Sequence, residues 1–258
     1  MTRLAFNVFN PDSMEALAAA ANETNIPVFM QVSVSTVRYL GIQTVLKIYN
    51  EINEKKLIQL HLDHCNDLDF IKRCIDSGWN SIMADFSSEP IDENIKKLNI
   101  IRSYLPESHG KIEGEVGSIG GEEDEFRGNN SGKAKLDEIR KILNETQIDL
   151  LAVGIGNIHG HYSDNSQVDY DHFKLIFKTF PSAKLVLHGA TGLPLRKIKE
   201  LVPYGLEKVN FSTELKDVYI SALNQVLSGA DKYNMTKYSS HAKSCMTLYF
   251  SKKMKEFT

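Results

Sequence analysis

Three histidines, His64, His159 and His188, stand where short apolar runs end, and each is followed by a cysteine or a glycine. A single histidine at a strand end is more often a hydrogen-bonded structural residue than a metal ligand. Parallel strands, however, carry functional groups at their shared carboxyl ends. If the three runs are neighbouring strands, their imidazoles would form a three-nitrogen site, which is typical of a catalytic zinc with an open fourth position.

Carboxylates accompany these histidines. Asp63, beside His64, could be a capping aspartate or a general acid/base next to a metal-bound oxygen. Asp85 ends another apolar run, so it could hold the second nitrogen of a ligand histidine or serve as an alternative metal ligand. Glu113 and Glu115 share one strand face by their period of two. Two buried acids are costly without a cation, so they favour a metal or salt-linked centre.

The remaining histidines are assigned to other roles. His61 lies three residues before His64, so on a strand it faces the other way and is predicted to be packed or to support the site. His161 is a competing ligand in the sequence His-Gly-His-Tyr. The others fall in turns or on a helix and are expected to be solvated; they are His109, His172 and His241.

Glycines and hydroxyl side chains follow the last three apolar runs. They include Gly160, Gly189 to Thr191, and Asn210 to Thr213. Barrel enzymes often bind phosphate there through backbone N–H groups and hydroxyls. Ser212 and Thr213 could equally cap the helix that follows. The pattern therefore leaves two alternatives, a phosphate site or a plain helix start.

Eight apolar runs must position these side chains, and helical patterns separate them. The runs are mostly continuous rather than alternating, as expected of strands buried on both faces. They span 4–9, 27–33, 57–64, 81–87, 111–117, 150–156, 184–190 and 208–213. Helices are expected over 12–23, 68–75, 91–105, 135–146, 169–180, 195–202, 214–227 and 242–257. This alternation predicts one α/β domain over 1–258, a single (β/α)8 TIM barrel with an extra C-terminal helical segment.

Two segments break the regular alternation. Residues 117–135 are glycine-rich and acidic with almost no apolar anchor, and they leave the carboxyl end of the fifth run. Long loops in compact domains are usually lids or disordered spans, and this position favours a mobile lid that carries a carboxylate. The polar stretch after Gly229 is predicted to be a loop up to His241, before the last helix.

Bulk properties exclude several classes of protein. The net charge of −3 gives no indication of the basic surface with which proteins bind nucleic acids or membrane surfaces. No apolar run approaches the roughly 18 residues that span a bilayer. The three cysteines, Cys65, Cys74 and Cys245, show no CxxC spacing, which indicates a reducing cytoplasm rather than a disulfide framework. The chain also begins without the apolar core of a signal peptide, so we expect a cytoplasmic protein.

Six motifs, in order, carry a family resemblance: Leu60-His-Leu-Asp-His-Cys, Ser81-Ile-Met-Ala-Asp-Phe-Ser, Ile112-Glu-Gly-Glu-Val-Gly-Ser-Ile-Gly-Gly-Glu-Glu-Asp, Ile155-Gly-Asn-Ile-His-Gly-His-Tyr, Val186-Leu-His-Gly-Ala-Thr-Gly and Lys208-Val-Asn-Phe-Ser-Thr-Glu-Leu. The series resembles the class II, metal-dependent ketose-bisphosphate aldolases, which act on fructose or tagatose 1,6-bisphosphate. The likeness runs from Ala5 to about Leu227. It is specific for the superfamily but not for the sugar.

The resemblance implies roles for individual residues. His64, His159 and His188 match the ligands of Zn²⁺, or of Co²⁺, Fe²⁺ or Mn²⁺. Asp63 matches the acid/base for the aldehyde-derived oxygen, and Glu123 matches the lid carboxylate that moves a proton at the nucleophilic carbon. Two residues, Asp85 and Glu115, match a second, inward metal position. The match to the phosphate-binding and substrate-binding residues comprises Asn7, Ser33, Gly160, Gly189, Thr191, Asn210, Ser212 and Thr213.

The implied activity is reversible cleavage of a phosphorylated ketose, first of all fructose 1,6-bisphosphate, to dihydroxyacetone phosphate and an aldehyde. A divalent ion on neutral imidazoles would stabilise the enediolate as a Lewis acid. No Schiff-base lysine is needed, because Lys111, Lys184 and Lys208 are predicted to begin strands, at the opposite end from the chemistry. The resemblance further implies a homodimer or homotetramer, and a monovalent-cation site at the backbone of Gly160 and Gly189.

Two departures from the family pattern bear on the substrate. Phe86 stands where relatives usually have glycine, which could reshape the pocket. Thr236 stands where an arginine that binds the far phosphate is expected. Neither Lys237 nor Lys243 can form the bidentate hydrogen bonds to phosphate that arginine forms. Tagatose 1,6-bisphosphate or another phosphorylated keto-sugar is therefore an alternative. A metal-dependent hydrolase on the same barrel is a more distant one, and a non-catalytic sugar-phosphate sensor is the third.

Overall fold

Eight parallel strands close into a barrel in the computed structural model, which describes residues 2–52, 56–123, 126–128, 132–162, 168–227 and 234–258. Around the barrel the order is β1-β11-β10-β8-β5-β4-β3-β2. This confirms the predicted (β/α)8 architecture. The strands are β1 (Arg3–Val8), β2 (Val28–Ser33), β3 (Ile58–Cys65), β4 (Ser81–Ala84), β5 (Lys111–Val116), β8 (Leu150–Val153), β10 (Leu185–Leu187) and β11 (Leu206–Phe211).

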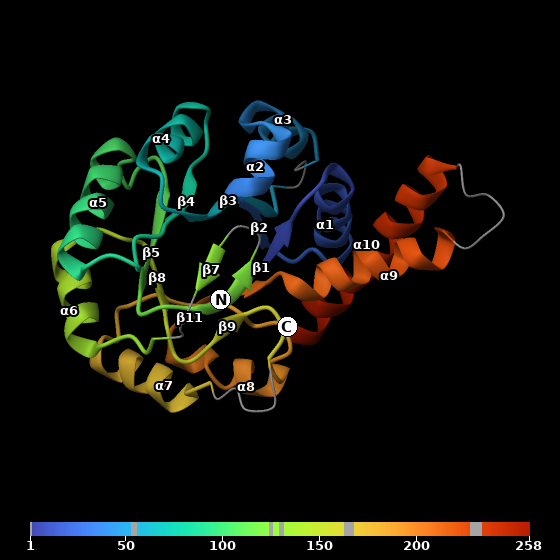
Figure 1. The fold of residues 1–258 in the computed structure, drawn as a ribbon. Coiled ribbons are helices and arrows are strands. Elements are labelled where there is room, and N and C mark those ends of the chain that lie inside the picture. Colours follow the sequence, from blue (N-terminus) through green and yellow to red (C-terminus); the bar gives the residue numbers. More distant parts are fainter. Residues whose placement is uncertain (1, 53–55, 124–125, 129–131, 163–167, 228–233) are drawn as a thin grey trace.

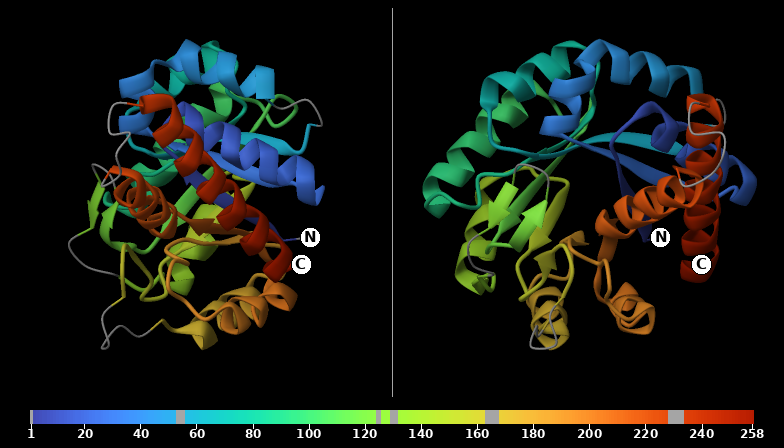
Figure 2. Two further views of the ribbon diagram at one scale, coloured as in Figure 1. Left: turned by 90° about the vertical axis from the view of Figure 1, so that its right-hand side faces the viewer. Right: turned by 45° about the vertical axis from the view of Figure 1, so that its right-hand side comes forward.

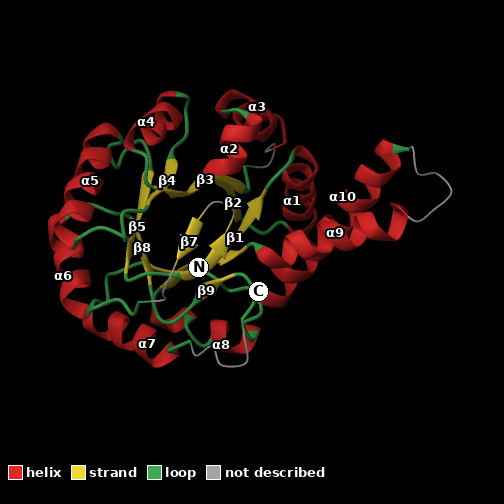
Figure 3. Cartoon of the chain, viewed as in Figure 1, coloured by secondary structure: helices red, strands yellow, loops and turns green. Residues whose placement is uncertain are grey.

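Helices surround the strands on the outside, as Figure 3 shows in red and yellow. They are α1 (Pro11–Thr24), α2 (Val34–Leu40), α3 (Ile42–Ile52), α4 (Leu68–Asp76), α5 (Ile91–Tyr104), α6 (Leu136–Glu145), α7 (Tyr170–Thr179), α8 (Leu195–Lys199), the 3-10 turn η1 (Val202–Tyr204), α9 (Thr213–Leu227) and α10 (Met235–Phe257). Within the described ranges, each helix is too short or too polar to cross a membrane.

Local capping explains where two of these helices begin. Before α1, the Asn10 side chain accepts a hydrogen bond from the Ser13 N–H at 2.8 Å, and the Ser13 hydroxyl accepts from the Asn10 N–H at 3.0 Å. This reciprocal capping box makes Asn10 the N-cap and places the start of α1 at Pro11, one residue before the predicted start of that helix. The Asp67 side chain caps α4 by accepting from the Phe70 N–H at 3.0 Å.

Helix α10 is the extra C-terminal element, and it begins at Met235 rather than at the predicted Ala242. It packs beside α1 and crosses α9, as Figures 1 and 2 show. Phe250 of α10 is fully buried, with its ring centroid 5.0 Å from that of Phe6 in β1. Phe6 also stacks on Phe211 at 5.8 Å. The helix therefore covers the seam where β1 and β11 close the barrel.

The apolar core is divided by the barrel wall. Most buried apolar residues lie between the strands and the helices, including Leu17, Phe173 and Phe86. Phe86, which we had expected to affect the pocket, is fully buried in this layer. A smaller cluster consists of Met83, Leu150, Ala152 and Val186. By strand alternation these four face into the barrel, which makes its interior only partly apolar.

The segment after β5 differs from the predicted structureless lid. Its described part forms β6 (Gly120–Glu123) and β7 (Phe126–Gly128), which pair antiparallel, and β6 also pairs parallel with β9 (Ile158–His159). Residues 124–125 and 129–131 of the predicted lid lie outside the described residues. The pairing of Gly121 with His159 ties this segment to a predicted metal ligand.

Two further boundaries differ from those predicted. Helix α8 ends at Lys199, three residues early, and η1 follows. Strand β11 begins at Leu206, so Lys208 is its third residue rather than its first. Lys208 is fully buried. Lys208 therefore does not lie at the amino-terminal rim, and the prediction that it begins its strand was wrong.

Candidate active site and metal centre

The three predicted histidine ligands meet at one end of the barrel. His64 is the next-to-last residue of β3, His159 is in β9, and His188 directly follows β10. The ring centroid of His64 is 4.9 Å from that of His159 and 4.7 Å from that of His188. One nitrogen of each ring lies within 4.8 Å of the others. The donor set and its compactness fit a divalent ion held by three imidazoles.

His64 is held in an unusual backbone conformation and by a buried carboxylate. Its φ of 42° is rare for a residue other than glycine, and such strain is concentrated at functional sites. Its Nδ1 lies 2.8 Å from Asp85 Oδ2. Burial acts to lower the pKa of His64, but the charge of Asp63 and the contact with Asp85 outweigh it and raise that pKa to about 10. Burial acts to raise the pKa of Asp85, but His64 lowers it to about 2.

His188 also has a carboxylate behind it, that of Glu113. This pairing was not predicted from the sequence. The Nε2 of His188 lies 2.8 Å from Glu113 Oε1, and its Nδ1 lies 2.9 Å from His64 Nε2. A carboxylate accepting from the second nitrogen is the usual support of a metal-bound histidine. Asn210 Nδ2 lies 3.1 Å from both nitrogens of the ring. The ring therefore has its Nδ1 directed toward the histidine cluster.

Glu113 is paired with Lys208 in the barrel interior. Lys208 Nζ lies 2.6 Å from Glu113 Oε2, and both side chains are fully buried. Lys208 Nζ also lies 3.2 Å from His61 Nε2, while His61 Nδ1 lies 2.8 Å from Ser81 Oγ. Burial and then the charge of Lys208 lower the pKa of His61 well below its usual range. His61 is thus packed, as predicted, and lies next to the partners of His188.

Asp63, the predicted acid/base, is oriented by two amides. Asn7 Nδ2 donates to Asp63 Oδ2 at 2.7 Å, and Gln31 Nε2 donates to Asn7 Oδ1 at 2.9 Å. All three side chains are buried, and the strands that carry them, β1, β2 and β3, are neighbours. A charge-assisted bond in a buried site holds the carboxylate in one orientation. Gln31 was not identified from the sequence, because an isolated glutamine in an apolar run carries no motif.

A second possible metal group shares one histidine with the first. It consists of His64 together with Asp85 and Glu115, the two residues predicted for an inward metal position. Glu115 is fully buried. Burial, and then the charge of Asp85, raise the pKa of Glu115 well above its usual range. A divalent ion between these carboxylates would remove that penalty.

Two glycines allow the segments around His159 to approach closely. Gly121 has φ +89°, and a Cβ there would lie 2.1 Å from the His159 carbonyl oxygen. Gly189 has φ +60°, and a Cβ there would lie 2.1 Å from the Ile158 carbonyl oxygen. The backbone of Glu123 ends β6 in the same small sheet; its side chain lies outside the described part of the chain. No side chain longer than hydrogen fits at either glycine without moving β9.

The predicted phosphate residues follow neighbouring strands of the barrel. Strands β10, β11, β1 and β2 are consecutive in the wall. Their carboxyl ends carry Gly189, Thr191, Asn210, Ser212, Thr213, Asn7 and Ser33, and Gly160 directly follows β9. Among the described residues, the buried Asn210 Oδ1 and Ser212 Oγ have no hydrogen-bond partner. Buried polar atoms are nearly always paired, so these two atoms indicate a place for a polar ligand.

The other histidines do not belong to the cluster, and three of them have other partners. The His161 side chain is 68% exposed and lies 3.4 Å from Asp217, so it does not join the three ligands. His172 is half-buried, with Nε2 2.7 Å from the Ala134 carbonyl oxygen, and is therefore less solvated than expected. His241 lies on α10, 3.1 Å from Gln225. The competing ligand set through His161 is thereby excluded geometrically.

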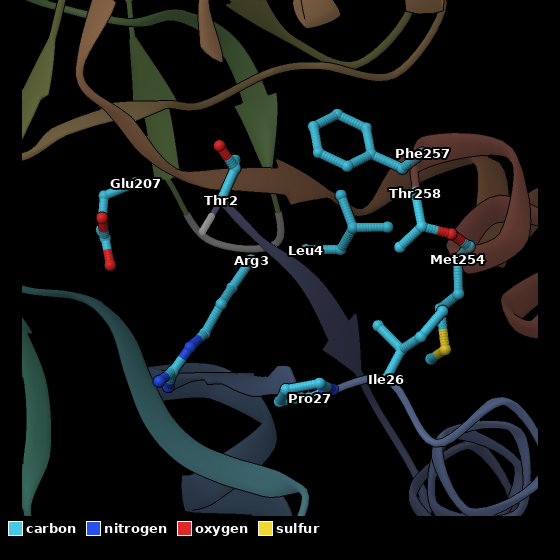
Figure 4. A pocket seen from close by; sticks show the side chains of 9 residues that line it. All are labelled: Thr2, Arg3, Leu4, Ile26, Pro27, Glu207, Met254, Phe257 and Thr258. Atoms are coloured by element: carbon cyan, nitrogen blue, oxygen red, sulfur yellow. The ribbon is translucent and has the colours of Figure 1, made fainter. Parts of the chain in front are cut away.

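A pocket at the opposite end of the barrel offers different chemistry (Figure 4). It lies where β1 and β11 begin, and its lining includes Arg3, Pro27, Glu207 and Phe257. Neither histidine nor cysteine is among its lining residues. Within the described part of the chain, the two groups of side chains that could hold a metal ion both lie at the carboxyl-end site.

Comparison with known proteins gives matches over almost the whole chain. Residues 2–258 match the family described as fructose-bisphosphate aldolase class-II. A fructose-bisphosphate aldolase of Staphylococcus epidermidis is 31% identical over 258 residues, covering 98% of this chain and 90% of the relative. One from Geobacillus stearothermophilus is 29% identical with the same coverage.

Solved structures show the same fold. A putative fructose-1,6-bisphosphate aldolase from Coccidioides immitis superposes with a TM-score of 0.88 at 23% identity, covering 98% of this chain and 90% of that one. The YdjI aldolase from Escherichia coli K12 gives a TM-score of 0.83 at 23% identity, covering 99% and 91%. At these identities, the structural likeness is evidence for the barrel architecture alone.

Proposed function

Because this chain belongs to the class-II fructose-bisphosphate aldolase family, we propose that it cleaves fructose 1,6-bisphosphate reversibly to dihydroxyacetone phosphate and an aldehyde. As a member of that family it is a metal-dependent aldolase, a carbon–carbon lyase. The observation that carries the proposal is the meeting of His64, His159 and His188 beside the oriented carboxylate of Asp63. This arrangement supplies a metal site and an acid/base on one rim.

We propose that His64, His159 and His188 hold Zn²⁺, because three imidazoles suit zinc; Co²⁺, Fe²⁺ and Mn²⁺ remain alternatives. When bound, the ion supplies a Lewis acid for the ketone of the substrate. Asp85 and Glu113 orient two of the rings from behind. Asp85 and Glu115 would offer the inward position. Backbone near Gly160 and Gly189 would hold a monovalent cation.

Two carboxylates would move the protons. In the cleavage direction, Asp63 would accept the proton of the hydroxyl that becomes the aldehyde oxygen. The electron pair of that O–H bond forms the aldehyde C=O bond, and the pair of the breaking carbon–carbon bond moves into the enediolate. Asn7 keeps the Asp63 carboxylate in one orientation for this task. Glu123 would then return a proton to the carbon of dihydroxyacetone phosphate. Its backbone ends β6, the strand in which Gly121 pairs with His159. The reverse sequence makes the carbon–carbon bond.

The phosphate next to the ketone would be held along the rim. Ser33, Gly160, Gly189, Thr191, Asn210, Ser212 and Thr213 form the proposed set. The unpaired Ser212 Oγ and Asn210 Oδ1 support it, since each needs a polar partner. Asn210 Oδ1 would accept from a substrate hydroxyl, while Ser212 Oγ–H would donate to phosphate.

Thr236 supports a test of alternative substrates. It is exposed at the start of α10, where the family pattern has arginine, and its hydroxyl donates to Asn234 Oδ1 at 3.0 Å. A threonine cannot neutralise a second phosphate. Tagatose 1,6-bisphosphate and ketose monophosphates therefore belong beside fructose 1,6-bisphosphate in the assay.

The experiment couples released triose phosphate to a dehydrogenase and follows NADH. We expect turnover of at least one ketose phosphate, loss with a chelator, recovery with zinc, and no inactivation by borohydride. The variant His188→Ala should lose both zinc and activity. Turnover that survives complete metal removal would refute the proposal, and water-dependent release of inorganic phosphate would favour the hydrolase.

We also propose a homodimer or homotetramer in a reducing cytoplasm. Large apolar side chains are exposed on the α9–α10 pair, including Ile220 at 55% and Leu248 at 69%. Such side chains on one projecting element are typical of an interface. Cys65, Cys74 and Cys245 are free thiols, which supports a reducing compartment. Light scattering would measure the oligomer, and a monomeric mass at working concentrations would refute it.

A further inference from the structure

A buried ion pair lies directly behind one proposed metal ligand. Glu113 in β5 and Lys208 in β11 are fully buried, and their charged atoms are 2.6 Å apart. The other oxygen of Glu113 lies 2.8 Å from His188 Nε2. Removing two charges from water is expensive, and an apolar pair of similar volume is often as stable. The pair is therefore poorly explained by folding stability alone.

The positions of the protons follow from which groups can only donate. The Lys208 ammonium has no acceptor, so His61 Nε2, at 3.2 Å, must accept from it. His61 therefore carries its proton on Nδ1 and donates to Ser81 Oγ at 2.8 Å. The Glu113 carboxylate can only accept, so His188 must donate through Nε2–H. The Nδ1 of His188 is then the nitrogen with a lone pair.

We propose that Lys208 is a positioning residue that keeps Glu113 as an acceptor for His188 and thereby makes Nδ1 the metal-binding nitrogen of that ring. The inference rests on the proposed three-histidine metal site and goes beyond it by assigning the tautomer and its cause. Nδ1 of His188 faces His64 Nε2 at 2.9 Å, which is the direction that this assignment requires.

Because Lys208 is paired with Glu113, the isosteric substitution Glu113→Gln should weaken metal binding by His188. In Glu113→Gln, the new amide has one acceptor and one donor end. The Lys208 ammonium attracts the amide oxygen, because the ammonium and the amide NH₂ group are both donors and cannot form a hydrogen bond with each other. The amide N–H then faces His188 Nε2, which must accept, and the ring proton moves to Nδ1. Metal binding is opposed by that proton.

Removing the lysine from the same variant should reverse the effect. In Glu113→Gln combined with Lys208→Met, no ammonium holds the amide oxygen. His61 Nε2 lies 3.6 Å from Glu113 Oε2, so an amide N–H at that position has an acceptor. The amide oxygen can then face His188 Nε2–H again. A second substitution in a buried pair thus restores metal affinity rather than lowering it further.

The first measurement is nitrogen-15 NMR of the histidine rings in the whole protein. In the wild type loaded with zinc, we expect the His188 proton on Nε2 and the metal on Nδ1. In metal-free protein, we expect His61 to be protonated on Nδ1. A zinc-bound Nε2 at His188, or a His61 proton on Nε2, would overturn the assignment without any variant.

The second measurement is zinc affinity, by competition with a chromophoric chelator. We expect Glu113→Gln to bind zinc roughly 10- to 100-fold more weakly than the wild type, the usual cost of losing such a supporting group. The double variant with Lys208→Met should recover most of that loss. Equal or weaker binding by the double variant would refute the role of Lys208, and so would unchanged binding by Glu113→Gln.

A matched control separates this effect from charge removal in general. Glu15 and Lys243 form an exposed pair at 2.7 Å on α1 and α10. Glu15→Gln, alone or with Lys243→Met, should leave zinc affinity unchanged. Failure of the proposed metal site itself is distinguished by His188→Ala: if that variant binds zinc as the wild type does, the histidine cluster is not the site.

Discussion

Zinc affinity should depend on pH through the buried pair of His64 and Asp85. In the metal-free protein the pKa of His64 is about 10, because Asp63 and Asp85 outweigh the effect of burial. A metal ion needs the neutral ring, so one proton must leave. At pH 7, three units below that pKa, the proton lowers zinc affinity roughly thousand-fold, or about 4 kcal/mol. Affinity should therefore rise about tenfold per pH unit from pH 6 to pH 9.

The sign of the linkage also predicts the stability of the metal-free protein. The pKa of His64 in the folded protein lies above its usual value of about 6.5, so its contribution to stability is fully present below pH 6.5 and is lost as pH rises through about 10. The folded pKa of Asp85 lies below 3.8, so its contribution is present above pH 3.8 and is lost as pH falls through about 2. Removal of metal should therefore leave the pair most stabilising between pH 4 and 6.5.

The assay is chelator competition for zinc across pH 6 to 9, repeated with Asp85→Asn. Without that carboxylate the pKa of His64 should fall. Zinc affinity should then stop rising with pH at a lower pH than in the wild type. Asp92→Asn is the matched control, because Asp92 is exposed and pairs with Lys141 between the outer helices α5 and α6. A wild-type affinity that does not change across this range would refute the reasoning.

Three further predictions test other parts of the site. Gly121→Ala should weaken zinc binding, since its Cβ would lie 2.1 Å from the His159 carbonyl oxygen; unchanged affinity in equilibrium dialysis would contradict this. Asn7→Ala removes a buried hydrogen bond to Asp63, worth about 1.5–3 kcal/mol, and should lower kcat roughly tenfold or more with normal zinc content by elemental analysis. Borohydride with substrate should form no adduct at Lys208 by mass spectrometry, because that amine is fully buried and ion-paired; a labelled Lys208 would contradict the metal route.

The periodicity of the sequence was sufficient to predict the barrel. Continuous apolar runs alternating with helical patterns are local features, and they identify buried parallel strands wherever they occur. Because the strands are parallel, residues that follow them must share one rim. That rule predicted that His64, His159 and His188 lie close together. In the structure, one ring nitrogen of each lies within 4.8 Å of the others.

Local patterns failed where a contact between distant segments decides the outcome. Residues 120–123 lack apolar anchors, yet they form β6 because β9 offers its backbone as a pairing partner. The polar segment that begins at Met235 was predicted to be a loop but forms the first turns of α10. Later in the same helix, Phe250 packs against Phe6. In both cases tertiary packing overrides weak local propensity.

Local sequence patterns were sufficient to predict the barrel, its succession of strands along the chain, and the side chains that stand at strand ends. The groups that lie behind those side chains depend on tertiary contacts and could not be predicted in this way. Glu113 and Lys208 are 95 positions apart in the chain, and no periodicity relates β5 to β11 across the barrel. Closure of the sheet sets that distance, and a buried charge is acceptable only where closure brings its partner within contact.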